Sequence, residues 1–119
     1  MRYVDGFVFV IPKKNVPAFV KIAKLAGAVW KEHGALQYCE SVGNDLSPKM
    51  PLTFPKVMKL KKSETIGFSW IVFKSKAHRD RVNAKVMKDP RLAEMCHADD
   101  MPFDIKRMCY GGFEIVVDE

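Results

Sequence analysis

Four segments of the chain carry short runs of apolar, β-branched and aromatic residues that predict β-strands. The first covers residues 3–11 and stops at Pro12, and the second, residues 36–42, alternates between two faces. The third covers residues 65–73 and the fourth residues 107–117. A side-chain period of two places alternate residues of each run on opposite faces of a sheet. The pattern therefore predicts a four-stranded sheet.

The segment between the first two strands has the period of an amphipathic helix. Asn15 is a good N-cap, Pro17 is tolerated in a first helical turn, and Gly34 is typical just after a helix end. Between them, one stripe of the helix carries Phe19, Ile22, Ala23, Ala26, Trp30 and His33. We expect a helix of about 18 residues, or about 27 Å, whose apolar stripe packs on the sheet.

Two more helices are predicted after the third strand. Ser75 is an N-cap for a helix that runs to about Lys88, and Asp89-Pro90 predicts a short extra helix to about Cys96. The segment between the second and third strands has no helical period. Residues 43–55 contain Asn, Asp, Ser and three prolines and predict a long loop. Residues 56–62 alternate and predict a strand extension or a hairpin arm.

The predicted order of elements is β-α-β-β-α-β, which is that of the ferredoxin-like fold. The chain has no internal repeat, low-complexity segment or domain boundary, so residues 1–119 form one α+β domain with a four-stranded antiparallel sheet. In this fold both helices cover one face of the sheet. The other face must be wet, bind a ligand or be covered by a partner.

Apolar residues occupy both faces of the predicted strands. In the first strand Phe7 and Phe9 share a face opposite three valines, and in the third strand Phe68 and Trp70 oppose Ile71. About five large apolar side chains left in water would form a patch of several hundred Å², which soluble monomers rarely tolerate. We therefore predict an isologous sheet-to-sheet homodimer. Its predicted interface residues are Phe7, Phe9, Phe68 and Trp70.

Residues 67–73, GFSWIVF, offer a different explanation for the apolar face, because they resemble an aromatic strand motif of RNA-recognition domains. Ile66 stands where that motif needs Lys or Arg. The net charge of +6 and the pI near 9.3 permit nucleic-acid binding but do not require it. Binding of RNA or single-stranded nucleic acid through Phe9, Phe68 and Trp70 is the less favoured alternative. A purely structural or interaction protein that uses the loop 44–55 is another.

Composition places the chain among soluble globular proteins. It is 48% hydrophobic and 29% charged, and its longest apolar runs are far shorter than a membrane span. Its N-terminus carries Asp5 and lacks a small-residue cleavage site, so we expect no signal peptide. The three cysteines form no CxxC motif, which favours reduced thiols in the cytoplasm.

Polar residues beside the apolar stripe predict a ligand site in the cleft between the first helix and the sheet. His33 and Glu40 are candidate general bases, and Trp30 and Tyr38 are candidate walls. Glu40 lies on an otherwise apolar strand face, so its carboxylate needs a partner such as Arg107 or a ligand. Asp5 has the same ambiguity. The predicted ligand-binding residues are Trp30, His33, Tyr38, Glu40, Arg107 and Tyr110.

Other chemistry-bearing residues carry weaker predictions. His78 is expected to be a partly exposed helix residue, and Arg79, Asp80 and Asn83 are expected to make surface or intrahelical polar contacts. Cys96-His97 with Asp99-Asp100 lacks the second spaced pair of a strong metal site, so we expect no metal. No Ser/His/Asp set, phosphate-binding loop or nucleotide fingerprint is present, and we expect no cofactor.

Four stretches of the chain carry a family resemblance: MRYVDGFVFVIPKKNVPAF, AGAVWKEHGALQYCE, ETIGFSWIVFKSKAHRDRVNAKVMKDP and RMCYGGFEIVV. Together they resemble the YbaA-like family of small bacterial proteins, a domain of unknown function. The resemblance runs nearly end to end, and it implies the dimeric α/β-barrel group of ferredoxin-like folds, which pair sheet to sheet. That group includes cofactor-free monooxygenases, haem enzymes and small-ligand binders, so the resemblance implies no particular activity.

Overall fold

The structure, a computed structural model, describes residues 1–95 and 101–119. Within these ranges no helix combines the length and the hydropathy that a membrane-crossing segment needs. A 3-10 turn, η1 (Lys13–Asn15), precedes the first helix. The other elements follow in the order β1 (Tyr3–Pro12), α1 (Val16–Glu32), β2 (Gln37–Val42), α2 (Phe54–Met58), β3 (Glu64–Phe73), α3 (Lys76–Met87), α4 (Pro90–Met95) and β4 (Asp104–Glu114).

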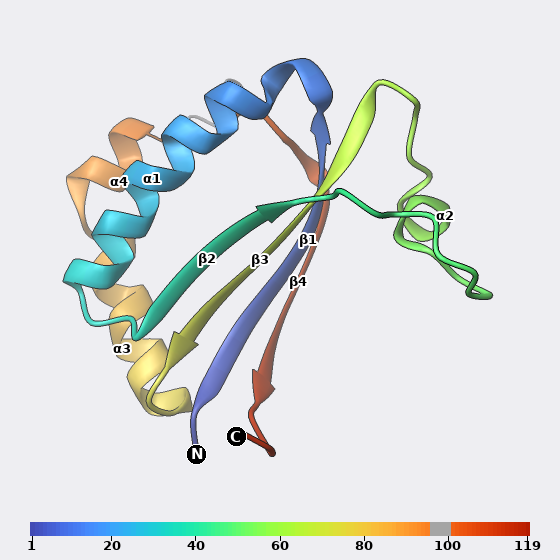
Figure 1. Cartoon of the computed structure of the whole chain (residues 1–119). Helices are drawn as coiled ribbons and strands as arrows, with labels where there is room; N and C mark the ends of the chain where they lie inside the picture. Colours follow the sequence, from blue (N-terminus) through green and yellow to red (C-terminus); the bar gives the residue numbers. More distant parts are fainter. Residues whose placement is uncertain (96–100) are drawn as a thin grey trace.

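The four strands form one antiparallel sheet in the order β2-β3-β1-β4. Figure 1 shows α1, α3 and α4 on one side of this sheet, while the segment that carries α2 projects from the other side. The order of elements and the strand order are those of a ferredoxin-like fold. This confirms the fold predicted from the sequence.

The strand period explains where the core lies. On the helical side, Phe73 and Ile71 of β3 pack with Val29 of α1 and Val82 of α3, and Phe9 of β1 packs with Phe19 of α1. A third cluster lies on the other side of the sheet, where α2 covers one end of it. This cluster contains Val10, Met58 and Ile66, with Val8, Leu46 and Leu60 packed against it.

Helix ends follow the predicted signals with one exception. The Ser75 hydroxyl accepts a hydrogen bond from the His78 N–H, and Gly34 follows α1 with φ +119°, a conformation that glycine adopts without strain. Asn15 precedes α1, but its side chain does not cap the helix. Its Nδ2 instead donates to the Pro102 carbonyl oxygen at 3.2 Å, which ties the start of α1 to the chain before β4.

Two predicted strand segments are corrected. Residues 56–62 do not form a strand, because α2 begins behind the Thr53 cap, Met58 is buried, and Lys59 ends the helix at φ 51°. The alternation of apolar and Lys residues there reflects a buried Met58 and a half-buried Leu60 between exposed lysines. The last strand runs from Asp104 to Glu114 and not from 107 to 117, since it pairs with β1 only over that range.

Candidate functional site

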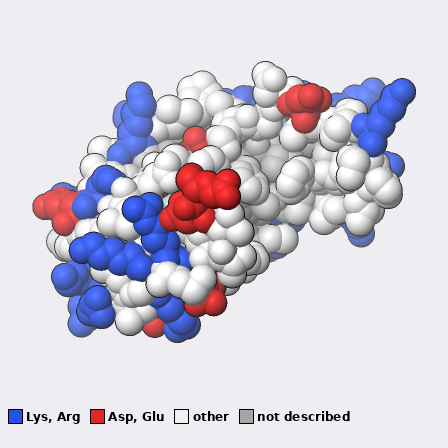
Figure 2. Space-filling model, turned by 60° about the horizontal axis from the view of Figure 1, so that its bottom comes forward, with Lys and Arg blue, Asp and Glu red and all other residues white. Residues whose placement is uncertain are grey.

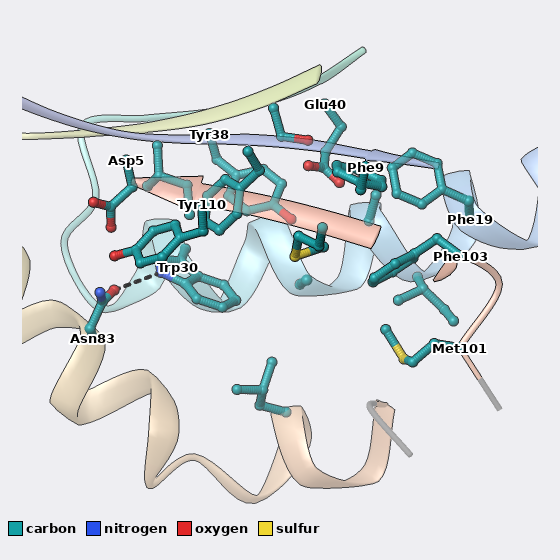
Figure 3. A pocket seen from close by; sticks show the side chains of 18 of the residues that line it. Asp5, Phe9, Phe19, Trp30, Tyr38, Glu40, Asn83, Met101, Phe103 and Tyr110 are labelled. Atoms are coloured by element: carbon teal, nitrogen blue, oxygen red, sulfur yellow. Dashed lines mark hydrogen bonds between the residues drawn. The ribbon is translucent and has the colours of Figure 1, made fainter. Parts of the chain in front are cut away.

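A cavity of about 480 Å³ lies between the sheet and the helical layer (Figure 3). Its volume falls in the range of pockets for small ligands. Figure 3 shows Asp5, Tyr110 and Asn83 at one end and Phe9, Phe19 and Phe103 at the other. Most of the side chains in its wall are aromatic, aliphatic or those of methionine. The remaining lining residues are Phe7, Ile22, Ala23, Ala26, Trp30, Tyr38, Glu40, Ser69, Ile71, Met87, Leu92, Met101 and Met108.

A buried ion pair closes one end of this cavity. The Arg79 guanidinium donates to Asp5 at 2.9 Å and to the Tyr110 hydroxyl at 2.6 Å, and it lies 4.9 Å from the centre of the Tyr3 ring. Asp5 is only 1% exposed. Burial raises the pKa of this carboxyl and Arg79 opposes the rise. Burial also raises the pKa of Tyr110, and the negative charge of Asp5 adds to this rise.

Glu40 and Ser69 face the cavity from directly paired positions of β2 and β3. Burial raises the pKa of Glu40, and the nearby Ser69 hydroxyl partly offsets that rise. The two groups do not meet hydrogen-bond geometry, and Ser69 Oγ is buried without a hydrogen-bond partner among the described residues. Within residues 1–95 and 101–119, no Lys, Arg or His forms an ion pair with Glu40.

A groove of about 430 Å³ runs between α1 and the β2 edge, on the outer side of the same wall. Tyr38 and Glu40 line both the groove and the cavity, so they separate the two spaces. Gly27 of α1 permits this wall to lie close to the helix, because a Cβ there would stand 2.8 Å from the Tyr38 ring. Lys24 and Lys31 line the groove, and Lys31 Nζ donates to the Leu36 carbonyl oxygen at 2.8 Å.

The predicted base His33 is not part of the cavity wall. It is the C-cap residue of α1, and its Nε2 lies 2.8 Å from Asp89 Oδ2. Hydrogen bonds from Arg91 and then His33 hold the pKa of Asp89 well below its ordinary value. These contacts join the end of α1 to the start of α4, so His33 has a structural place in the fold.

Arg107 also lies away from the cavity. Its guanidinium donates to both carboxylate oxygens of Glu64, at 2.8 and 3.1 Å, and to the Met58 carbonyl oxygen. Of the two partners expected for Glu40, Arg107 or a ligand, Arg107 is therefore excluded. His78 is partly exposed, as expected, and its Nδ1 accepts a hydrogen bond from the Lys74 N–H.

Sequence reasoning missed two residues of α3 at the cavity. Arg79 was expected to make surface or intrahelical contacts, and it does donate to Asp80, but it also pairs with the buried Asp5. Asn83 accepts a hydrogen bond from Trp30 Nε1 at 3.2 Å. The available signal was Asp5, an acidic residue on an apolar strand face, which requires a buried cationic partner. Trp30, Tyr38, Glu40 and Tyr110 do meet at the cavity, as their grouping predicted.

The four predicted interface residues do not share one face. Phe7 and Phe9 point to the helices, and Phe9 is 2% exposed. Phe68 and Trp70 lie on the opposite face, which we call the open face, with their ring centres 5.6 Å apart. The large apolar side chains of the open face include Val4, Val8, Phe68, Trp70 and Phe113.

The position of Phe9 argues against the RNA-binding alternative, which uses Phe9, Phe68 and Trp70 together. Phe68 is 45% exposed and Phe113 is 59% exposed. Figure 2 shows Lys and Arg gathered over the helical side and on the projecting segment, with a mostly uncharged surface between them. Phe9 cannot contribute to a nucleic-acid platform there, because its ring is buried on the other side of the sheet.

The Cys96-His97 cluster with Asp99-Asp100 lies outside the described residues. Elsewhere in the described chain, no three His, Cys, Asp or Glu residues are grouped so that they could hold a metal ion. The residues that the structure gathers at the cavity are two carboxylates, one guanidinium, hydroxyls and aromatic rings. This set can orient a small ligand and exchange a proton with it.

Comparison with known proteins gives a family and a fold. The chain is 42% identical to Uncharacterized protein YbaA of Escherichia coli, and equally to that of Shigella flexneri, over 119 residues and the full length of both. Two crystal structures of Atu4242 from Agrobacterium tumefaciens, one described as a nipsnap family protein with unknown function, align with TM-score 0.57 at 16% identity. They cover 94% of this chain, and 91% and 86% of theirs, which shows the fold alone. Residues 2–105 match the model named Protein of unknown function (DUF1428). The YbaA-like resemblance is confirmed, and the chain belongs to the DUF1428 family.

Proposed function

We propose that this protein binds a small, largely apolar molecule in the cavity between α1 and the sheet. The observation that carries this proposal is the cavity itself, about 480 Å³ with an apolar wall and a few convergent polar side chains. Ligand pockets typically combine a mostly apolar lining with a small number of placed polar groups that fix orientation. Here the aromatic end supplies apolar contact, and Glu40, Ser69 and the Asp5–Arg79–Tyr110 group supply the polar contacts.

A pocket-filling variant tests this proposal. Ala26 of α1 is 7% exposed and lines the cavity, so Ala26→Leu places new atoms inside it. The matched control is Ala18→Leu on the exposed side of the same helix. We expect a screen of neutral aromatic fragments by ligand-observed NMR to yield binders that Ala26→Leu weakens about tenfold and Ala18→Leu leaves unchanged. Absence of any binder, or equal binding to both variants, would overturn the proposal.

We also propose that the open face is covered by a second copy of the chain. Support comes from its composition and exposure, because Phe68 and Phe113 are about half exposed beside two valines and Trp70. A two-fold pairing would bury these side chains against their own equivalents. Light scattering should give a mass near twice 13.6 kDa that persists on dilution and in high salt. A persistent monomer would contradict the dimer and would make an RNA titration the next experiment.

A further inference from the structure

Among the described residues, the centre of the cavity wall holds a buried hydroxyl without a hydrogen-bond partner and a carboxylate without a cation. Ser69 is 3% exposed, and its Oγ makes no hydrogen bond among the described residues. Glu40 stands opposite Ser69 in the register of β2 and β3 and lines the same cavity. A buried polar group without a partner is costly, so such groups mark places where something else completes the contacts.

The two carboxylates at the cavity, Asp5 and Glu40, differ in whether a cation pairs with them. Asp5 has Arg79 at 2.9 Å, so its charge is already compensated. In the part of the chain that the structure covers, Glu40 takes part in no ion pair. The basic side chains that line the adjoining groove belong to Lys24 and Lys31, on the outer side of the wall. The inner side of Glu40 therefore presents an acceptor without a cation.

We propose that the ligand of this cavity is an apolar amine, whose ammonium group binds between Glu40 and Ser69 while its hydrocarbon part packs among Phe9, Phe19 and Phe103. This inference rests on the proposed function and names the chemical class of its ligand. An ammonium group has three donors and no acceptor, so one group can donate to both the carboxylate and the hydroxyl oxygen. The three aromatic rings lie with centres 5.1–6.1 Å apart and form the apolar end.

Other head groups satisfy this pair of acceptors less well. An alcohol can donate to Glu40 and accept from the Ser69 hydroxyl, but it lacks the charge that strengthens a hydrogen bond to a carboxylate. A ligand carboxylate would stand beside Glu40 as a like charge in an apolar cavity, which is unfavourable. The head groups are therefore ranked amine, then alcohol, then carboxylate.

Isothermal titration with three molecules of one skeleton tests the inference: phenylbutylamine, phenylbutanol and phenylbutyrate. At neutral pH we expect the amine to bind about tenfold more tightly than the alcohol and the carboxylate to bind least. Glu40→Gln should remove the preference for the amine and change the affinity for the alcohol little. Glu114→Gln, an exposed carboxylate at the far end of β4, is the matched control and should keep the preference.

The outcomes separate this inference from the proposed function. If the alcohol or the carboxylate binds as tightly as the amine, the amine assignment is wrong while the cavity remains a ligand site. Retention of the amine preference in Glu40→Gln would also overturn the assignment. If none of the three molecules binds and the neutral fragments also fail, the cavity is not a ligand site. Ser69→Ala adds a second readout, because it should weaken the amine several-fold through loss of one acceptor.

Discussion

Ser69 is a small polar residue in the middle of an otherwise apolar strand. Its hydroxyl is buried beside a carboxylate and opposite an apolar helix, and it contributes no standard hydrogen bond to the described fold. Burying a hydroxyl without a partner costs free energy of folding. The residue is therefore better explained by what the cavity binds than by what stabilises the chain.

Ser69→Ala should leave the free energy of unfolding unchanged or raise it by about 1 kcal/mol in the absence of ligand, because it removes a buried unpaired hydroxyl. Urea denaturation at fixed protein concentration measures this. Ser41→Ala is the matched control, since the Ser41 hydroxyl donates to the Phe68 carbonyl oxygen on the neighbouring strand. A loss of more than about 1 kcal/mol for Ser69→Ala would show that its hydroxyl has a stabilising partner.

Glu40→Gln should change the pH dependence of stability. Burial raises the folded-state pKa of Glu40 above 4.5, so its contribution is fully present below 4.5 and is lost as pH rises through the raised pKa. The variant should therefore gain stability relative to the parent as pH increases above 4.5. Unfolding midpoints measured between acid and neutral pH test this.

Glu64→Gln gives the opposite sign and serves as the control for this pH series. Hydrogen bonds from Arg107 lower the pKa of Glu64, so its contribution is present above 4.5 and disappears as pH falls through the lowered pKa. The Glu64 variant should lose stability relative to the parent toward neutral pH. Parallel pH profiles for the parent and Glu40→Gln would contradict the burial of the Glu40 carboxylate.

At the scale of elements, a buried ion pair joins α3 to the sheet in addition to the apolar packing of Val82. Arg79→Met leaves the Asp5 carboxylate buried without its cation, and such a change costs about 3–5 kcal/mol of stability. Removing both charges in Asp5→Leu with Arg79→Met should restore most of the loss. Chemical denaturation of the two variants measures this, and equal losses in the single and double variants would count against the pair.

Close packing against β1 explains why a glycine, the first residue of GFSWIVF, stands at this position of β3. Gly67 pairs with Phe9 of β1, and a Cβ at Gly67 would stand 2.5 Å from the Phe9 ring. Gly67→Ala should therefore cost about 1–3 kcal/mol through overpacking. Gly6→Ala on the same sheet is the control, because its Cβ would meet only Phe113 at an ordinary 3.6 Å. Equal thermal shifts for the two variants would contradict this role of Gly67.

How much the sequence predicts depends on whether a signal is local. The four strands, α1 and α3 follow from periodicity and caps, because these depend on neighbouring residues. The contact of Arg79 with Asp5 spans 74 positions, and no local pattern indicates which helical residue faces a given strand residue. Helix α2 was missed because five residues with one buried side chain carry too little periodicity to separate a helix from a strand.

At the scale of the whole molecule, the sheet separates two surfaces of different chemistry. The helical side encloses the cavity with its charged and hydroxyl groups, and the open face presents aromatic and aliphatic side chains. The proposed ligand site and the proposed self-association surface therefore lie on opposite sides of one layer. Each can be altered by substitutions that do not touch the other.

Phe68→Glu should convert the proposed dimer into a folded monomer, since it places a charge in the middle of the open face. Leu25→Glu is the control, because Leu25 is similarly exposed, at 51%, but lies on the outer side of α1. Light scattering with circular dichroism measures mass and folding together. A Phe68 variant that keeps twice the monomer mass would show that the subunits meet elsewhere.

Strand β3 serves both surfaces, with Ser69 toward the cavity and its neighbours Phe68 and Trp70 toward the open face. Adding or deleting one residue within it would exchange the two sets, placing aromatic rings in the cavity and a hydroxyl outside. The strand is also hydrogen-bonded on both edges, so it cannot shift to absorb the change. Insertions and deletions among related proteins should therefore be absent from β3. They should be concentrated in the exposed chain around residues 47–52, which does not pair with a strand.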